Sequence, residues 1–170
     1  PEAAMAEGSG AVWTMQVNGD HPDGSPFITA MFTYAGGVGA RANKPGLSAC
    51  SYPTGVSAVP IEVVEASAPI RFHEKSLRLG SGGNGAQIGG LGQAIEFSVD
   101  TDRAWQLNAV TSRLADPPLG VFGGEPGEWC EWGVTSGKGA NGYNLSSARV
   151  RRTARPGDGA RVVEPRDYRG

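Results

Sequence analysis

The sequence predicts a mainly β fold: a β-sandwich-like domain with many glycine- and proline-rich turns and at most one or two short helices. Apolar residues recur with the period of two that is typical of a half-buried β-strand. Clusters of turn formers separate these stretches about every eight to twelve residues, as in an all-β sandwich. The 170 residues include 27 glycines and 12 prolines, well above average usage. We therefore expect residues 1–170 to form a single, turn-rich domain with its own core.

The first third of the chain predicts a β-hairpin with a long loop. In residues 11–18, AVWTMQVN, the side chains of Trp13, Met15 and Val17 share one face. Residues 26–34, PFITAMFTY, form a continuous apolar run of strand length. The stretch GDHPDGSP between them concentrates turn formers, so we expect the two strands to pair.

The middle of the chain predicts further strands and one ambiguous segment. Residues 58–67, AVPIEVVEAS, fit either a helix that begins near Pro60 or a strand rich in valine and isoleucine. Residues 69–79 alternate as a strand does. Residues 93–100, QAIEFSVD, and 104–112, AWQLNAVTS, are also expected as strands, joined by TDR.

The C-terminal region combines two expected strands with a basic charge bias. These are residues 148–154, ARVRRTA, and 160–165, ARVVEP, with the turn sequence RPGDG between them. In residues 148–170 arginines outnumber the acidic residues. This bias could indicate an arm that binds an acidic partner through its charge. The plainer interpretation is a solvated face or a surface in contact with an acidic partner subunit.

The overall composition points away from nucleic acid and membranes. The net charge is −2, from 15 basic and 17 acidic side chains, which leaves no general basic footprint for either partner. No run of about 18 apolar residues exists, which excludes a transmembrane helix.

The N-terminus has neither an initiator Met nor a signal peptide, so we expect a piece of a longer, cytoplasmic protein. Cys50 and Cys130 are then expected as free thiols. His21 and His73 complete no ligand spacing, so we expect no metal site.

Residues 80–92, GSGGNGAQIGGLG, raise the question of a phosphate loop. A dinucleotide loop needs G-x-G-x-x-G at the start of a helix, but Ile88 replaces the third glycine and an expected strand follows. The stretch GVTSGKGA around Lys138 lacks the spacing of a P-loop. We expect the glycines of residues 80–92 to supply positive φ and close backbone approach in a tight connection between strands.

Few side chains offer chemistry of their own. Cys50 and Ser51 lie in a turn-like segment with no local base, and His73 lies within an expected strand. Glu62 and Glu65 are three residues apart and would meet on a helix face as a carboxylate pair. A solvated helix turn is the plainer interpretation of that pair.

Several segments, in order along almost the whole chain, resemble the C-terminal part of the hydantoinase B/oxoprolinase family, in its N-methylhydantoinase B-type subunits. MFTYAGGVGARANKPGLSA resembles the family's G-G-x-G-A-R segment. PTGVSAVPIEVVEASAPIR resembles a V-P-x-E-x-x-E unit followed by P-[LIV]-R, and GSGGNGAQIGGLG resembles the glycine-rich loop after it. PPLGVFGGEPG resembles the loop G-x-x-G-G-x-P-G.

This chain departs from the family pattern at three positions and in length. Gly80 and Pro45 stand where the family usually has Asp, and Ile88 stands where it usually has Arg. If those residues brace the turn in the family, this loop lacks the brace. Members of the family run for several hundred residues before this part, so the chain resembles the last third or so of such a subunit.

The resemblance implies part of an ATP-dependent two-component enzyme that opens cyclic amides such as hydantoins and 5-oxoproline. Alternatives are part of a related ketone carboxylase or a non-catalytic β-sandwich assembly module. ATP would bind a hydantoinase A-type subunit and a divalent metal would bind the remainder of the hydantoinase B-type subunit. This chain would bind neither, give scaffold and subunit interface, and be inactive alone. The residues expected to touch substrate or take part in catalysis are Gly36, Gly37, Gly39, Arg41, Glu62 and Glu65; Arg41 could hold a carboxylate by a bidentate contact.

Overall fold

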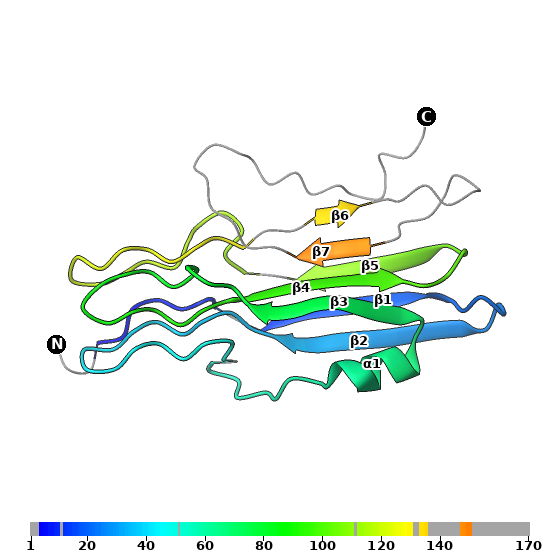
Figure 1. The fold of residues 1–170 in the computed structure, drawn as a ribbon, viewed down its shortest axis with the longest axis horizontal. Coiled ribbons are helices and arrows are strands. Elements are labelled where there is room, and N and C mark those ends of the chain that lie inside the picture. The colour runs from blue at the N-terminus through cyan, green and yellow to red at the C-terminus, as the bar shows by residue number, and fades with distance from the viewer. Residues whose placement is uncertain are drawn as a thin grey trace.

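The computed structural model describes residues 4–10, 12–50, 52–110, 112–130, 133–135 and 147–150. Within these residues the chain forms β-strands and one short helix, and the strands make two antiparallel sheets (Figure 1). The predicted mainly β fold is therefore confirmed.

The first sheet contains the predicted hairpin. Strands β1 (Trp13–Asp20) and β2 (Pro26–Tyr34) pair antiparallel, with a register shift between Trp13 and Thr14. Strand β5 (Trp105–Val110) pairs with the other side of β1, which gives the order β2-β1-β5. Trp13, Met15 and Val17 alternate with less buried residues along β1, as the sequence predicted.

The second sheet has the order β3-β4-β7-β6. Its strands are β3 (Ile70–Leu77), β4 (Gln93–Val99), β6 (Gly133–Thr135) and β7 (Ser147–Val150). Strands β4 and β5 follow one another in the chain but belong to different sheets, so residues 100–104 cross from one layer to the other. Strand β7 covers the beginning of the predicted strand 148–154. The predicted strand 160–165 and most of the arginine-rich region lie outside the described residues.

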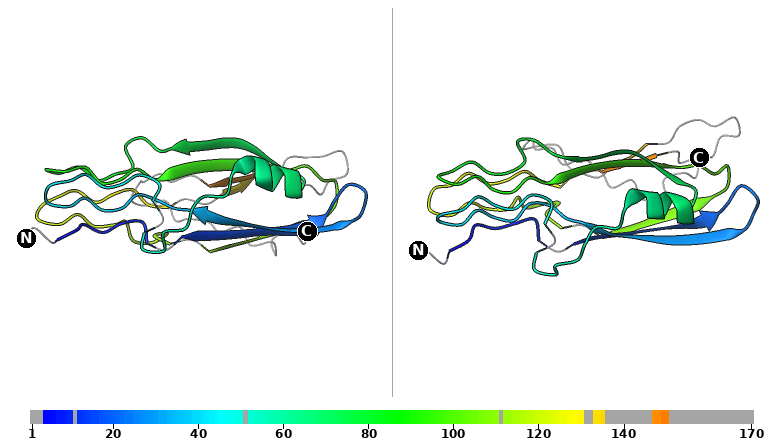
Figure 2. Two further views of the ribbon diagram at one scale, coloured as in Figure 1. Left: turned by 90° about the horizontal axis from the view of Figure 1, so that it is seen from below. Right: turned by 60° about the horizontal axis from the view of Figure 1, so that its bottom comes forward.

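The hydrophobic core lies between the two layers, which Figure 2 shows one above the other. Strand β1 contributes Trp13 and Met15, and β4 contributes Ile95 and Phe97, all of them at most 1% exposed. These side chains belong to one buried cluster, because alternate residues of each strand point into the same interlayer space. The fold is a sandwich of two sheets around this core.

The ambiguous segment 58–67 is helical. Helix α1 (Ile61–Ser67) begins after Pro60, whose φ of −57° suits the start of a helix. It ends before Pro69, a residue that disfavours helical backbone in its predecessor. Val64 is the buried residue of the helix and joins the core. Because α1 contacts β2 of one sheet and β3 of the other, it lies along one side of the sandwich (Figure 2).

Among the described residues, no helix is long and apolar enough to cross a membrane.

Candidate functional site

Four extended, glycine-rich segments converge at one end of the sandwich, on the left in Figure 1. They are residues 4–10 before β1, 36–50 after β2, 80–92 between β3 and β4, and 118–128 after β5. We call them together the glycine array. Unlike ordinary surface loops, these segments lie against one another and pair through their main chains.

Backbone hydrogen bonds close the glycine array into a ring. Each segment bonds to the next, and the fourth segment pairs again with the first. The N–H to O=C bonds that join them are Ser9 to Gly37 (2.9 Å), Gly90 to Val38 (2.9 Å), Glu125 to Asn84 (2.8 Å) and Glu7 to Leu119 (3.1 Å). The backbone polar groups of these exposed connections are thereby satisfied without regular strand pairing.

Glycine is required in the array because its segments are closer than a side chain permits. A Cβ atom on Gly37 would lie 1.8 Å from the carbonyl oxygen of Gly90, and one on Gly39 would lie 1.8 Å from that of Ala6. A Cβ on Gly90 would lie 2.1 Å from the carbonyl oxygen of Leu47. These separations are far below contact distance, so only hydrogen atoms fit between the main chains.

This geometry corrects the expectation for residues 80–92. Only Gly80 of this stretch has a positive φ, 79°, whereas Gly82, Gly83 and Gly90 serve close approach. The stretch does connect neighbouring antiparallel strands. The connection is not tight, however, because it extends away from the strands to contribute two passes of backbone to the array. Ile88, at the position where the resemblance expected Arg, is 54% exposed.

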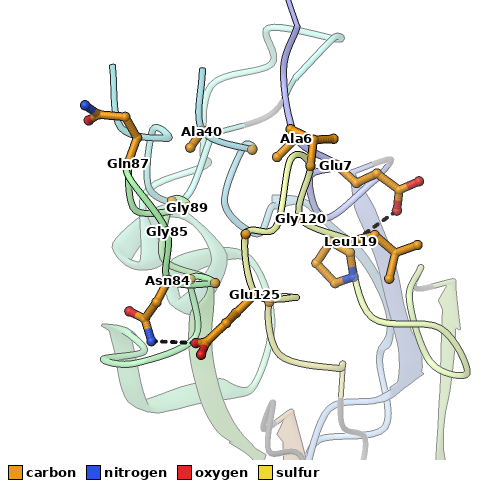
Figure 3. Close-up of a pocket in the computed structure, with 18 of the residues that line it drawn as sticks. Ala6, Glu7, Ala40, Asn84, Gly85, Gln87, Gly89, Leu119, Gly120 and Glu125 are labelled. Carbon is orange, nitrogen blue, oxygen red and sulfur yellow. Dashed lines mark hydrogen bonds between the residues drawn. The ribbon is translucent and has the colours of Figure 1, made fainter. Parts of the chain in front are cut away.

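The glycine array encloses an open cavity of about 250 Å³ (Figure 3). All four segments line it, mostly with glycine and alanine. Its charged lining side chains are Glu7, Arg41 and Glu125. The walls are therefore main chain and small apolar groups, with few polar side chains to orient a ligand.

The two carboxylates of the cavity hold segments of the array together. Oε2 of Glu7 accepts the backbone N–H of Leu119 at 3.1 Å and forms an ion pair with Nη1 of Arg113, also at 3.1 Å. Oε2 of Glu125 accepts a hydrogen bond from Nδ2 of Asn84 at 2.9 Å. Figure 3 shows the hydrogen bonds that join Glu7 to Leu119 and Glu125 to Asn84. No local sequence pattern signals these contacts, since each joins residues far apart in the chain.

Arg41 lines the cavity, and this residue is exposed. Its backbone forms a tight reversal with Lys44, through Arg41 N–H to Lys44 O at 2.9 Å and Lys44 N–H to Arg41 O at 3.4 Å. Within the described part of the chain, Arg41 forms no salt bridge. Its guanidinium is therefore available to an anion.

The structure separates the residues that the sequence put forward. Gly37, Gly39 and Arg41 line the cavity, whereas Gly36 does not line it, and its carbonyl accepts the Cys50 N–H at 3.0 Å. Glu62 and Glu65 lie on the exposed surface of α1 and do not line the cavity.

Glu65 has a structural partner. Its Oε1 accepts the backbone N–H of Phe72 at 2.7 Å, next to the irregularity between Phe72 and Glu74 in the pairing of β3 with β4. This bond satisfies a backbone donor at the point where the strand register shifts. A role for Glu62 and Glu65 at a substrate stays a prediction.

His73 belongs to a hydrogen-bonded chain on the outer face of β3 and β4. Its Nε2 lies 2.9 Å from Oγ of Ser98, and that hydroxyl donates to Oδ1 of Asp100 at 3.3 Å. Arg71 in turn pairs with Asp100 at 2.9 Å. Ser98 lies between the imidazole and the carboxylate, so Asp100 does not orient His73 as a Ser-His-Asp triad requires. His73 is therefore an exposed side chain of β3, the strand in which the sequence placed it.

The remaining expected chemistry finds little support in the local geometry. Cys50 and Cys130 form no disulfide among the described residues, and Cys130 is buried in the core. Ser51 lies outside the described residues, and Oγ of Ser48 accepts the Leu91 N–H at 3.0 Å. In the described ranges, no cluster of three or more His, Cys, Asp or Glu residues could hold a metal ion.

Comparisons with known proteins agree with the resemblance that the sequence motifs carry. The family model for hydantoinase B/oxoprolinase matches residues 1–165. A 5-oxoprolinase from Dictyostelium discoideum is 34% identical over 97 residues, which cover 56% of this chain and 8% of that protein.

A solved structure has a similar fold. It is nucleotide-free acetone carboxylase, from a study of the mechanism of ATP-dependent acetone carboxylation, with a TM-score of 0.63 and 21% sequence identity. The match covers 75% of this chain and 17% of the carboxylase chain. In both relatives the matched region is thus a small share of a much longer polypeptide.

Proposed function

Because this chain belongs to the hydantoinase B/oxoprolinase family, we propose that it gives scaffold and subunit interface to an ATP-dependent two-component enzyme that opens cyclic amides. The substrate class rests on the family and on the 5-oxoprolinase relative, whose name specifies a cyclic amide. We place the enzyme in the cytoplasm, in a complex with a hydantoinase A-type subunit and the remainder of a hydantoinase B-type subunit. Residues 1–170 form one domain of that assembly.

The glycine array is the observation that supports a scaffold role. Its ring is built from backbone hydrogen bonds, and its carboxylates Glu7 and Glu125 are engaged in holding segments together. A site that catalysed hydrolysis would need a positioned base, nucleophile or metal cluster. The described residues around the cavity offer a single uncommitted charge, on Arg41.

The chemistry of the proposed reaction then belongs to other parts of the complex. ATP would phosphorylate the amide oxygen and make the ring carbon a better electrophile, and a divalent metal would activate water. The described side chains do not fit a metal site, so we assign no step of this kind to residues of this chain. Their contribution is to hold the segments of the array together and to present Arg41 in the lining of the cavity.

Arg41 is the residue of this chain that we propose for contact with an anionic substrate or intermediate. A bidentate guanidinium–carboxylate contact stabilises by about 1.5–3 kcal/mol. We therefore expect Arg41→Ala in the complete enzyme to raise KM about tenfold to a hundredfold. Lys44→Ala, which removes a neighbouring exposed cation across the same reversal, is the matched control. An Arg41→Ala enzyme with unchanged turnover and KM would contradict this role.

Reconstitution tests the proposed function itself. The chain would be produced with its hydantoinase A-type and hydantoinase B-type partners, and ATP hydrolysis would be measured with hydantoin or 5-oxoproline and, separately, with acetone and bicarbonate. ATP consumption coupled to ring opening is the expected result. Carboxylation of the ketone would instead favour the carboxylase alternative, and a complex active without this chain would favour a dispensable assembly module. Hydrolysis of a cyclic amide by the chain alone would overturn the assignment of the chemistry to its partners.

A further inference from the structure

A strained turn lies at the outer edge of the glycine array. Val121 to Gly124 form a reversal closed by the Gly124 N–H bonded to the Val121 carbonyl at 3.0 Å. The two central residues, Phe122 and Gly123, have φ values of 52° and 85°. Two positive φ values in succession are the pattern of a type I′ turn, whose first central position favours Asn, Asp or Gly. Phenylalanine is a poor choice there, because its Cβ is crowded in left-handed backbone.

The Phe122 side chain is also unfavourable in its surroundings. It is 83% exposed, although burial of such a side chain is favourable. Neighbouring apolar side chains of the same segment are also open to solvent, Leu119 at 56% and Val121 at 41%. All three line the cavity. Backbone strain and an exposed aromatic side chain at one position indicate a residue that serves a contact outside the described residues.

We propose that the Phe122 turn, together with Leu119 and Val121, docks this chain against an apolar surface of the remainder of the hydantoinase B-type subunit. The inference rests on the proposed function, whose interface it locates. The comparisons favour this occupant: the matched region is 8% of one relative and 17% of the other, so in both proteins most of a single long polypeptide lies outside it. A segment of the same polypeptide has a high effective concentration for such a contact. In protein interfaces a few side chains, aromatic ones often among them, supply most of the binding energy.

Photo-crosslinking in the complete enzyme identifies the occupant. Phe122→p-benzoylphenylalanine keeps an aromatic group at the turn and captures whatever lies against it. In the matched control, p-benzoylphenylalanine replaces Ile28, which lies on β2 and is 70% exposed. We expect position 122 to capture a peptide of the hydantoinase B-type subunit from outside residues 1–170, and position 28 to capture it far less. Capture of the hydantoinase A-type subunit, of a second copy of this chain, or of nothing above the control would overturn the proposal.

A second variant separates docking from folding. Phe122→Gly removes the side chain and also relieves the positive φ, so the thermal stability of the protein should stay unchanged or rise. Burial of a phenylalanine side chain strengthens a binding equilibrium by a factor of about ten to a hundred. Without that side chain, amide hydrogen exchange of residues 118–124 in the assembled enzyme should therefore become about ten to a hundred times faster. Ile28→Ala should leave this exchange unchanged. Equal exchange in Phe122→Gly and wild type would refute the docking role, whether or not the wild-type complex opens cyclic amides.

Discussion

Gly37→Ala is the substitution that tests most directly how the glycine array is held together. The added Cβ would lie 1.8 Å from the oxygen, 2.2 Å from the carbonyl carbon and 2.8 Å from the Cα of Gly90. To reach an ordinary contact of about 3.4 Å from that oxygen, one segment has to move by about 1.6 Å. No rotamer change relieves this overlap, because every atom involved is backbone.

Such a movement breaks the hydrogen bonds that flank the contact. Ser9 N–H to Gly37 O and Gly90 N–H to Val38 O are both 2.9 Å long, and a shift of that size takes them beyond bonding distance. Each lost bond costs about 1 kcal/mol, and more where a group stays unpaired. We expect a loss of about 2–4 kcal/mol in the free energy of unfolding, which for a chain of this size lowers Tm by roughly 5–15 °C.

The assay is thermal and urea unfolding of the purified protein, with Gly85→Ala as the matched control. Gly85 lies in the same array, but a Cβ there would have its nearest neighbours at 3.5 Å, an ordinary contact. Its substitution should change the unfolding free energy by less than about 1 kcal/mol, in either direction. Equal stability of the two variants would refute the idea that close backbone contact requires glycine at position 37.

Two further predictions concern the sandwich. Glu65→Ala removes the acceptor of the Phe72 N–H and should lower the free energy of unfolding, measured by urea titration, by about 1 kcal/mol. Glu62→Ala on the same helix is the control and should leave the free energy of unfolding unchanged. Equal effects of the two substitutions would show that the bond contributes nothing to stability. Burial raises the pKa of the Tyr34 phenol to about 12. Since the unfolded chain titrates near 10, the folded state holds this proton more tightly, and stability should fall as the pH rises from about 10 to about 12. Tyr34→Phe should flatten that part of a pH–stability profile measured by urea unfolding, and an unaltered slope would contradict the assignment to Tyr34.

The parts of the fold that follow from local pattern could be predicted from the sequence. The alternation placed Trp13, Met15 and Val17 on one face of a strand, which is the buried face of β1, and the turn formers after it predicted the hairpin. The segment 58–67 could not be settled by composition, because valine and isoleucine favour a strand. The helix forms where Pro60 begins it and the sandwich offers a place to bury Val64.

The candidate site was only partly predictable, because it depends on contacts between distant segments. The glycine-rich stretches were evident, but nothing local shows that Gly37 meets Gly90 or that Glu7 pairs with Arg113. The proposed docking role of Phe122 could not be predicted either, since the sequence does not show that its turn has two positive φ values. The motif resemblance placed Gly37, Gly39 and Arg41 in one segment, and the fold arranges three other segments around them.

The ring of backbone bonds also determines which changes in chain length the molecule can accept. Surface loops usually tolerate an inserted or deleted residue, because nothing fixes their position along the chain. Here one extra residue between Gly37 and Leu47 would displace glycines from the contacts with Gly90 and Ala6 and bring Cβ atoms into their place. The connections at this end of the sandwich should therefore be as intolerant of insertions and deletions as the strands of the core. Fusion partners or affinity tags are better placed in the reversal between β1 and β2, where exposed residues 22–25 form a loop at the opposite end of the strands (Figure 1).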